Sequence, residues 1–233
     1  MHKTVHRRQD GFKAHLAVEP DTGIITDCAL TGANGAANHE ATVGLALLDD
    51  EASPVTVLAD SAYGTGAFRA ELAARCHIDR VKPAPVRSVI PGGFSVDDFV
   101  VDHDARTATC PAGQIRSISR ANYANFGVAC RGCALRSRCT TNATGKALWI
   151  RPHDALQRNA RRQARNPAWL TEYQQHRPMV ERAIAWLVRG NRKLRYRGVS
   201  RNDHWLHHRV AALNLRRLIT LGLTRTQSGW AIA

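Results

Sequence analysis

The chain has 233 residues, 44% of them hydrophobic, which is enough for one large core or two small ones. Its net charge of +14 is uneven: residues 151–233 hold 17 Lys and Arg against 4 Asp and Glu, whereas residues 1–150 hold 16 against 15. A nearly neutral body followed by a strongly basic third favours a polyanionic partner such as nucleic acid over an ordinary soluble surface, where both signs intersperse. No apolar run approaches the roughly 20 residues of a membrane span, and none follows residues 1–8 as in a signal peptide, so we predict a cytoplasmic protein without membrane contact.

Residues 1–83 are predicted to begin an α/β domain with a mixed sheet. The apolar pattern predicts two strands joined by a turn rich in Pro, Asp and Gly, followed by alternating helices and strands. The predicted elements are strands at 12–18 and 24–30, a helix at 40–48 with Asn38 as its cap, a strand at 55–59, a helix at 66–76 and a short strand at 80–82. This order is typical of a mixed α/β sheet.

Asp60 stands where the apolar strand Val55–Ala59 ends and a turn containing Gly64 and Gly66 begins. Carboxylates at this edge of an open α/β sheet are typical ligand and metal positions. Asp is unfavourable inside a strand and costly to bury without a partner. Asp60 is therefore either a residue of the turn or a metal ligand, and both interpretations stay open at this level.

Residues 84–150 differ in character and are predicted to form a Cys-rich β insertion, with short strand-like runs such as Phe99–Val101 between turns. Four of the six cysteines follow the pattern C-x19-C-x2-C-x5-C, namely Cys110, Cys130, Cys133 and Cys139. A C-x2-C pair on a tight turn matches tetrahedral zinc, and disulfides are not expected in a reducing compartment. Arg131, Arg136 and Arg138 would favour thiolate over thiol. The open alternatives are a structural zinc site and four reduced thiols in a small fold.

Residues 151–233 are predicted to form a basic helical part, with helices at 154–165, 167–173, 178–189 and 205–221. Pro178 suits the first turn of the third helix, which would place Glu181 one turn inside it. Neighbouring cations would keep Glu181 ionised. A helical Glu commonly forms a solvated salt bridge, but this segment has only four acids in 83 residues, which makes a functional carboxylate the competing interpretation.

Seven cations in the basic part are candidates for contact with phosphate groups. They are Arg177, Arg182, Arg189, Arg192, Lys193, Arg195 and Arg197. The last five lie within nine residues, together with an aromatic residue, Tyr196. Tyr196, Trp186 and Trp205 could stack on bases or sugars, although Trp186, in mid-helix, is also a candidate core residue.

Taken together, these residues resemble the DDE transposases of bacterial insertion sequences, in the branch whose catalytic domain carries a Cys-rich insertion. The matching stretches are Gly11–His15 with Val18 and Glu19, Ala59–Gly66, Thr109–Gly113, the cluster Cys130–Cys139 and Arg177–Arg182. They extend over nearly the whole chain. Each motif alone is weak, and their common order makes the resemblance specific.

The resemblance implies an RNase H-like core that holds two divalent ions on three carboxylates and transfers phosphoryl groups on DNA. It implies that Asp60 is the second Asp of the triad, that Glu181 is its Glu, and that Arg177 touches phosphate. The ions would be Mg²⁺ or Mn²⁺, which suit carboxylate sites. The partners would be the ends of the insertion sequence and its target DNA, and the full-length protein would be a homodimer at the bacterial nucleoid.

The sequence departs from this family at its beginning. In the family a strand ending in the first catalytic Asp precedes the stretch that matches Gly11–His15, whereas Asp10 here comes before a strand. We therefore expect an amino-terminally shortened RNase H-like sheet without its first strand, and a fragment that is inactive alone. The alternatives are a non-enzymatic, zinc-stabilised DNA-binding module that inhibits transposition, and a Holliday-junction or repair nuclease with the same core.

Two further departures concern residues around Glu181. Tyr173 is one residue further from Arg177 than the corresponding Tyr in related transposases, and Val188 stands where they carry Lys. Lys193 or Arg189 is a candidate replacement for that Lys.

Overall fold

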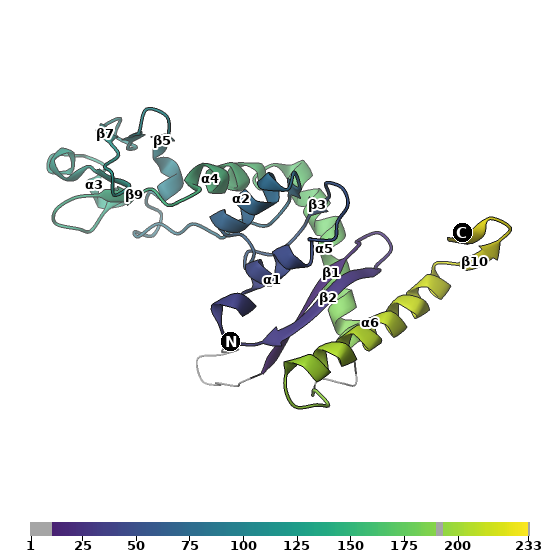
Figure 1. Ribbon diagram of the computed structural model, residues 1–233. Coiled ribbons are helices and arrows are strands. Elements are labelled where there is room, and N and C mark those ends of the chain that lie inside the picture. Colours follow the sequence, from purple (N-terminus) through teal and green to yellow (C-terminus); the bar gives the residue numbers. More distant parts are fainter. Residues whose placement is uncertain (1–10, 190–192, 233) are drawn as a thin grey trace. The chain divides into compact units, whose positions relative to one another are not determined.

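The structure is a computed structural model that describes residues 11–189 and 193–232, and it divides into two compact units (Figure 1). The first unit is built from the chain up to Lys82 and from Gln163 onward, and the second is Pro83–Arg162. The first unit contains β1 (Phe12–Val18), β2 (Ile25–Gly32), η1 (Ala36–Asn38), α1 (Glu40–Ala46), β3 (Thr56–Val57), α2 (Gly66–Ala74), β4 (Ile78–Asp79), α5 (Pro167–Val188), α6 (Val199–Thr220), β10 (Leu223–Thr226) and β11 (Gly229–Ile232). The second contains η2 (Val96–Asp98), β5 (Val100–Asp102), β6 (Thr107–Thr109), β7 (Ile115–Ser117), β8 (Tyr123–Asn125), η3 (Gly127–Cys130), α3 (Arg136–Cys139) and β9 (Ala147–Trp149), and α4 (Asp154–Gln163) lies at its end.

Strands β1 and β2 form the predicted antiparallel hairpin, and helix α6 lies along β2 (Figure 1). Two side chains of α6 bind the backbone of this strand. The Ile25 amide donates to Asn214 Oδ1 at 3.0 Å, and the Leu30 amide donates to Asp203 Oδ1 at 2.7 Å. The core between the hairpin, α5 and α6 consists of Ile25, Cys28, Leu30, Ala183, Leu187, Leu206 and Val210. Helix packing therefore buries one face of the hairpin.

Strands β3 and β4 form a separate parallel pair, packed under α1 and α2. Backbone pairing continues past the assigned strand, because the Val57 and Ala59 carbonyls accept from the Arg80 and Lys82 amides. Within the described ranges, β1–β2 and β3–β4 remain two small sheets. The fold is thus a mixed α/β arrangement compatible with an RNase H-like domain, but the mixed sheet expected from the sequence is divided.

Helices α1 and α2 follow the prediction closely and end two residues earlier than expected. The cap of α1 is His39, whose Nδ1 accepts from the Ala41 amide at 3.2 Å, and not Asn38. In α2 the guanidinium of Arg69 is almost fully buried, pairs with Asp79 and donates to the Val81 carbonyl at 3.0 Å. This contact fixes α2 to the strand β4.

Helix α5 replaces two predicted helices. It begins at Pro167, is capped by Asn166, and continues through Pro178 to Val188. The prediction that Pro178 starts a helix is therefore wrong. A proline removes one backbone donor, and here the loss is offset by one buried helix face, which consists of Trp169, Tyr173, Ala183 and Leu187.

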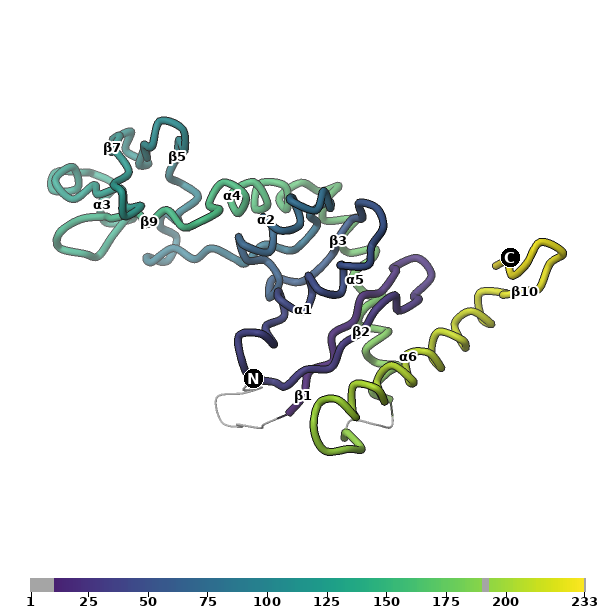
Figure 2. Tube along the Cα trace, in the orientation of Figure 1, coloured from purple at the N-terminus to yellow at the C-terminus, as the bar shows by residue number. Residues whose placement is uncertain are grey.

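The chain beyond α6 ends in a small hairpin, β10–β11, which the sequence did not indicate (Figure 2). Its residues are largely exposed, and the Trp230 side chain is 70% exposed. Across the described residues, no helix combines the length and the apolar character needed to cross a bilayer.

The second unit consists of the three-stranded sheet β5–β6–β7 and the pair β8–β9, all with strands of three residues. Its core contains Phe99, Ala108, Ile118, Ala124, Phe126, Cys130, Cys139, Leu148 and Ile150. Helix α4 also packs here, since Arg158 donates to the Phe99 carbonyl at 2.8 Å and Arg161 pairs with Asp97 at 2.7 Å. This unit therefore extends to Arg162, past the expected end of the insertion at residue 150.

Candidate active site and nucleic-acid interface

Asp60 follows the backbone pairing of β3 directly. Its Oδ1 accepts from the Ala62 amide at 2.9 Å, which is the turn contact that the sequence offered as one interpretation. Its Oδ2 instead faces Arg177 Nη2 at 3.6 Å. Asp60 therefore closes a turn with one oxygen and presents the other to helix α5, so the turn contact leaves one oxygen for a ligand.

The turn after Asp60 is tightly built. A Cβ at Gly64 would lie 2.8 Å from the Lys82 carbonyl oxygen, so glycine allows the close approach of the turn to the segment after β4. Thr65 then caps α2, accepting from the Phe68 amide at 3.2 Å. Gly64 thus allows the chain to turn sharply after the strand, and Thr65 then starts helix α2.

Glu181 lies on the same helix as Arg177, four residues later. Arg177 Nη2 is 3.4 Å from Glu181 Oε1 and 3.6 Å from Asp60 Oδ2. These two distances add up to 7.0 Å, which is the upper limit of the separation between the two carboxylate oxygens. The Asp60 and Glu181 side chains are 47% and 66% exposed, whereas that of Arg177 is 24% exposed. One half-buried cation thus joins two accessible carboxylates that are 121 positions apart in sequence.

Tyr173 connects helix α5 with the end of β3. Its hydroxyl donates to the Ala59 carbonyl at 3.3 Å, immediately before Asp60, and its ring stacks on that of Trp169 at 5.2 Å. Burial raises the pKa of this hydroxyl, and the nearby Arg177 opposes that rise. Tyr173, Arg177 and Glu181 lie four residues apart on one helix face, so the spacing Y-x3-R-x3-E directs all three toward the same strand end.

The donor chemistry of this site fits a hard divalent cation, but the donor set is small. Two carboxylates within 7.0 Å suit Mg²⁺ or Mn²⁺, which prefer oxygen ligands. In the described ranges, no three or more His, Cys, Asp or Glu side chains are grouped so that they could hold a metal ion. The described residues therefore offer two neighbouring carboxylates and no complete ligand group for a metal ion. Asp10 lies outside them.

Five of the predicted phosphate-binding cations are exposed, namely Arg182, Arg189, Lys193, Arg195 and Arg197. Arg192 lies outside the described residues. Tyr196 is 45% exposed and remains available for stacking, and Trp186 is 36% exposed, so its predicted place in the core is not borne out. The cations begin on the helix that carries Glu181 and continue into the loop that follows it.

Asn202 is a residue of this region that the sequence analysis missed. Its side chain is fully buried, accepts from the Tyr196 amide at 3.0 Å, and donates to the Tyr196 and Gly198 carbonyls at 2.7 Å each. It thereby fixes the end of the loop that carries Lys193, Arg195 and Arg197. The sequence signal that could have identified it is an Asn in the first turn of a helix, where its side chain can bind the backbone of the preceding loop.

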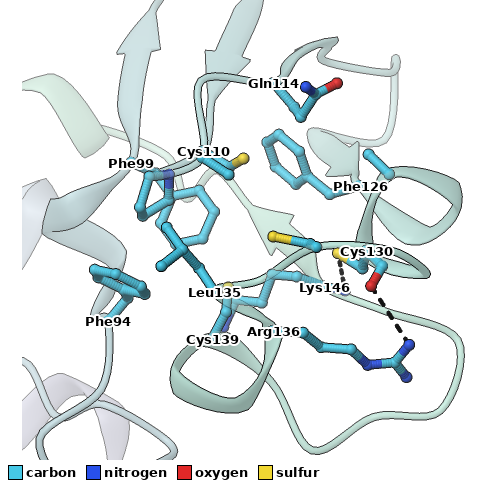
Figure 3. A pocket seen from close by; sticks show the side chains of 14 residues that line it. Phe94, Phe99, Cys110, Gln114, Phe126, Cys130, Leu135, Arg136, Cys139 and Lys146 are labelled. Carbon is cyan, nitrogen blue, oxygen red and sulfur yellow. Dashed lines mark hydrogen bonds between the residues drawn. The ribbon is translucent and has the colours of Figure 1, made fainter.

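The four cysteines of the second unit line a single pocket, together with Phe94, Phe99, Phe126 and Leu135 (Figure 3). All are free thiols. They do not form a ready-made metal-binding group among the residues that the structure describes, so the predicted zinc centre is not confirmed. Two of the nearby arginines contact groups other than the sulfur atoms: Arg136 donates to the Cys130, Asn142 and Ala143 carbonyls, and Arg138 lies 4.6 Å above the Phe94 ring.

Residues 109–219 match the family model described as "Transposase DDE domain". The matched segment, counted inclusively, is 111 of the 233 residues, just under half of the chain. It contains the four cysteines of the pocket, Arg177 and Glu181, whereas Asp60 lies outside it. No curated protein and no solved structure matches the chain.

Proposed function

Because residues 109–219 match the family model of the transposase DDE domain, we propose that this protein belongs to a system of DNA transposition and that Asp60 and Glu181 are two carboxylates of its metal-dependent strand-transfer centre. The reaction class is phosphoryl transfer on DNA, in which a water or a 3′-hydroxyl replaces a phosphodiester oxygen. The partners are the ends of an insertion sequence and its target. The chain alone is proposed to lack one catalytic carboxylate.

The observation that carries this proposal is the position of Arg177 between the two acids. Asp60 ends one strand and Glu181 lies on a distant helix, yet both are within 3.6 Å of the same guanidinium nitrogen. Two carboxylates repel each other, so a surface Glu is not expected close to the carboxylate at the end of a strand unless the site requires both. Carboxylate oxygens no more than 7.0 Å apart are compatible with two ions about 4 Å apart in a shared site.

When bound at this site, Mg²⁺ or Mn²⁺ would supply charge stabilisation for the attacking and leaving oxygens. The residues of the chain have separate tasks. Asp60 and Glu181 would hold the ion, and Tyr173 sets the distance between them by fixing α5 to the Ala59 carbonyl. Arg177 compensates the two negative charges, and it is well placed to turn toward a DNA phosphate once an ion takes over that role.

The basic surface is proposed to grip the DNA strand. Arg182 and Arg189 lie on the exposed side of the Glu181 helix or at its end, and Lys193, Arg195 and Arg197 follow in the loop that Asn202 fixes. Such contacts to phosphates make binding strongly salt-dependent and do not read base sequence. Sequence-specific recognition of element ends is therefore not assigned to these cations.

The proposed inactivity of the isolated chain is supported by the number of candidate ligands. Asp60 and Glu181 share one guanidinium, and the described residues contain no group of three or more candidate metal ligands. Two carboxylates hold a divalent ion weakly, because each Mg²⁺ must then keep most of its water shell. We propose that the third carboxylate comes from outside the described residues.

Nicking of supercoiled DNA by the full chain in Mg²⁺ or Mn²⁺, beside Asp60→Ala, tests the proposal. We expect the chain to bind DNA with an affinity that falls steeply with salt, and to nick no faster than Asp60→Ala. Nicking that depends on Asp60 would show that the chain itself supplies the missing ligand. Failure to bind DNA would overturn the proposed role in transposition.

The competing function is a non-enzymatic DNA-binding module that inhibits an intact transposase. It is favoured by the absence of a third ligand near Asp60 and Glu181 in the described ranges. Binding of Mn²⁺ separates the two. A remnant of a catalytic centre binds Mn²⁺ in a manner sensitive to Asp60→Asn and Glu181→Gln, whereas a pure binding module retains DNA affinity and shows no such metal binding.

A further inference from the structure

We propose that Cys110, Cys130, Cys133 and Cys139 form a structural zinc site that stabilises the second unit. This site is independent of the proposed chemistry at Asp60. The four thiols line one cavity of about 20 Å³, which has room for one water molecule or one metal ion. Binding requires the four sulfur atoms to turn toward the centre of this cavity, since they line it without forming a closed ligand group.

The thiols reach the cavity from three backbone segments (Figure 3). Cys110 lies at the turn between β6 and β7, where its amide donates to the Gln114 carbonyl and its carbonyl accepts from the Gly113 amide. Cys130 ends η3, and the Cys133 amide donates to its carbonyl at 3.4 Å, which folds the C-x2-C pair into a tight turn. Cys139 ends α3. Converging turns of this kind are how small zinc sites collect four thiolates.

The backbone around Cys130 is arranged for a thiolate. The Lys146 amide donates to Cys130 Sγ at 3.5 Å, a contact that stabilises negative charge on sulfur. This approach depends on Gly145, because a Cβ there would lie 2.7 Å from the Gly127 Cα and 3.1 Å from the Cys130 Cβ. The glycine brings a second loop against the C-x2-C turn.

The four sulfur donors also decide which ion the site would take. Zinc binds cysteine as the thiolate, so an ion held by all four thiols would release protons on binding. The soft sulfur donors select zinc over magnesium.

The second unit has short strands and a small core, so a bound metal ion would stabilise its fold. Every strand in it has three residues, and its core comprises nine buried side chains, two of which are Cys130 and Cys139. Small units with such limited cores commonly depend on a metal or on disulfides. The cysteines form no disulfides, so we propose that a metal ion is the cross-link that stabilises this unit.

Titration of the full chain with Zn²⁺ and Co²⁺, after removal of metal by a chelator, tests this proposal. We expect one ion to bind per chain, the Co²⁺ form to show the absorption of a tetrahedral thiolate complex, and Zn²⁺ to raise the melting temperature. Thiol reagents should then react with Cys110 and Cys133, the two less buried members of the group, more slowly with zinc than without it. A chain that binds no stoichiometric metal while its thiols react equally with and without Zn²⁺ would overturn the proposal.

Paired substitutions locate the site. Cys133→Ser should abolish the Co²⁺ spectrum, whereas Cys76→Ser, at an exposed cysteine of the first unit, should leave it unchanged. If Cys133→Ser does not fold, the titration of the unmodified chain still decides the question. Equal loss of metal in both variants would contradict the assignment.

Discussion

In the first unit the candidate ligands are carboxylates at the surface, and in the second they are thiols in or beside a core. Asp60 and Glu181 are 47% and 66% exposed and share one guanidinium, whereas Cys130 and Cys139 are buried. Exposed hard donors can exchange ligands with a DNA substrate, but they need a scaffold to keep them together. Buried soft donors are held in place by the fold, and a metal ion bound to them would stabilise the folded state. Under the two proposals, the first unit would carry the chemistry and the second would carry a structural metal.

The largest expected effect concerns the scaffold of the carboxylate site. Arg69→Met should lower the free energy of unfolding by about 3–5 kcal/mol, since it leaves Asp79 without its buried partner. Arg75→Met, on the same helix, removes a partly exposed pair with Asp49 and should cost at most about 1 kcal/mol. Urea unfolding measures both. Equal losses would show that the buried Arg69 does not fix α2 to β4 more firmly than an exposed ion pair would.

The basic loop provides the next effect. Asn202→Ala removes three hydrogen bonds from a fully buried side chain and should cost about 1–3 kcal/mol, together with a loss of DNA affinity. Asn214→Ala, which frees the backbone of Ile25, should lower stability without changing DNA affinity. Urea unfolding and fluorescence anisotropy with labelled DNA distinguish the two variants. Unchanged DNA binding in Asn202→Ala would remove the loop from the proposed interface.

Removal of the shared cation should strengthen metal binding at the carboxylates. Arg177→Gln is expected to raise the affinity for Mn²⁺ by about tenfold, roughly 1.4 kcal/mol, because a competing positive charge beside Asp60 and Glu181 is lost. Arg182→Gln makes the same change of charge at an exposed position on the same helix and should have little effect. Titration followed by electron paramagnetic resonance measures both. A weaker affinity in Arg177→Gln would mean that Arg177 chiefly positions the acids.

The smallest expected effect is a pH dependence at Glu40. The hydrogen bond from Lys13, at 2.7 Å, lowers the pKa of this carboxyl below its ordinary 4.5, against the opposing effect of burial. A lowered folded-state pKa gives stability that is present above the unfolded-state value and lost as the pH falls through the folded value. Glu40→Gln should therefore flatten the loss of stability between about pH 5 and 3 by less than about 1 kcal/mol. Glu51→Gln, at an exposed position, is the control, and an equal flattening there would contradict the assignment.

Local patterns predicted much of the first unit. The hairpin β1–β2, the helices α1 and α2 and the position of Asp60 after a strand follow from apolar periodicity and from turn residues. The continuous helix through Pro178 did not, because its burial against the hairpin outweighs the proline penalty. The meeting of Asp60 with Arg177 depends on packing over more than a hundred residues, which periodicity cannot encode. Resemblance to a family, and not local pattern, suggested that Asp60 and Glu181 share one site, and it did not suggest the contact of Asp60 with Arg177.

The sequence also did not predict that the sheet would be divided into the pairs β1–β2 and β3–β4. The apolar runs at 12–18 and 55–59 are each compatible with one shared sheet, and pairing partners decide whether they join. In α6, Asp203 and Asn214 accept hydrogen bonds from the backbone of β2. The sequence did not predict these contacts, because polar residues on a basic helix are usually expected to face solvent.

Localised cleavage of the polypeptide by bound Fe²⁺ tests the central claim most directly, because radicals generated at the ion cut the nearest backbone. If Asp60 and Glu181 hold one metal centre, the full chain should be cut near residue 60 and near residue 181 together. Excess Mg²⁺ and the substitution Asp60→Asn should suppress both cuts. Cleavage near only one of these residues, or at both but indifferent to Asp60→Asn, would contradict the account.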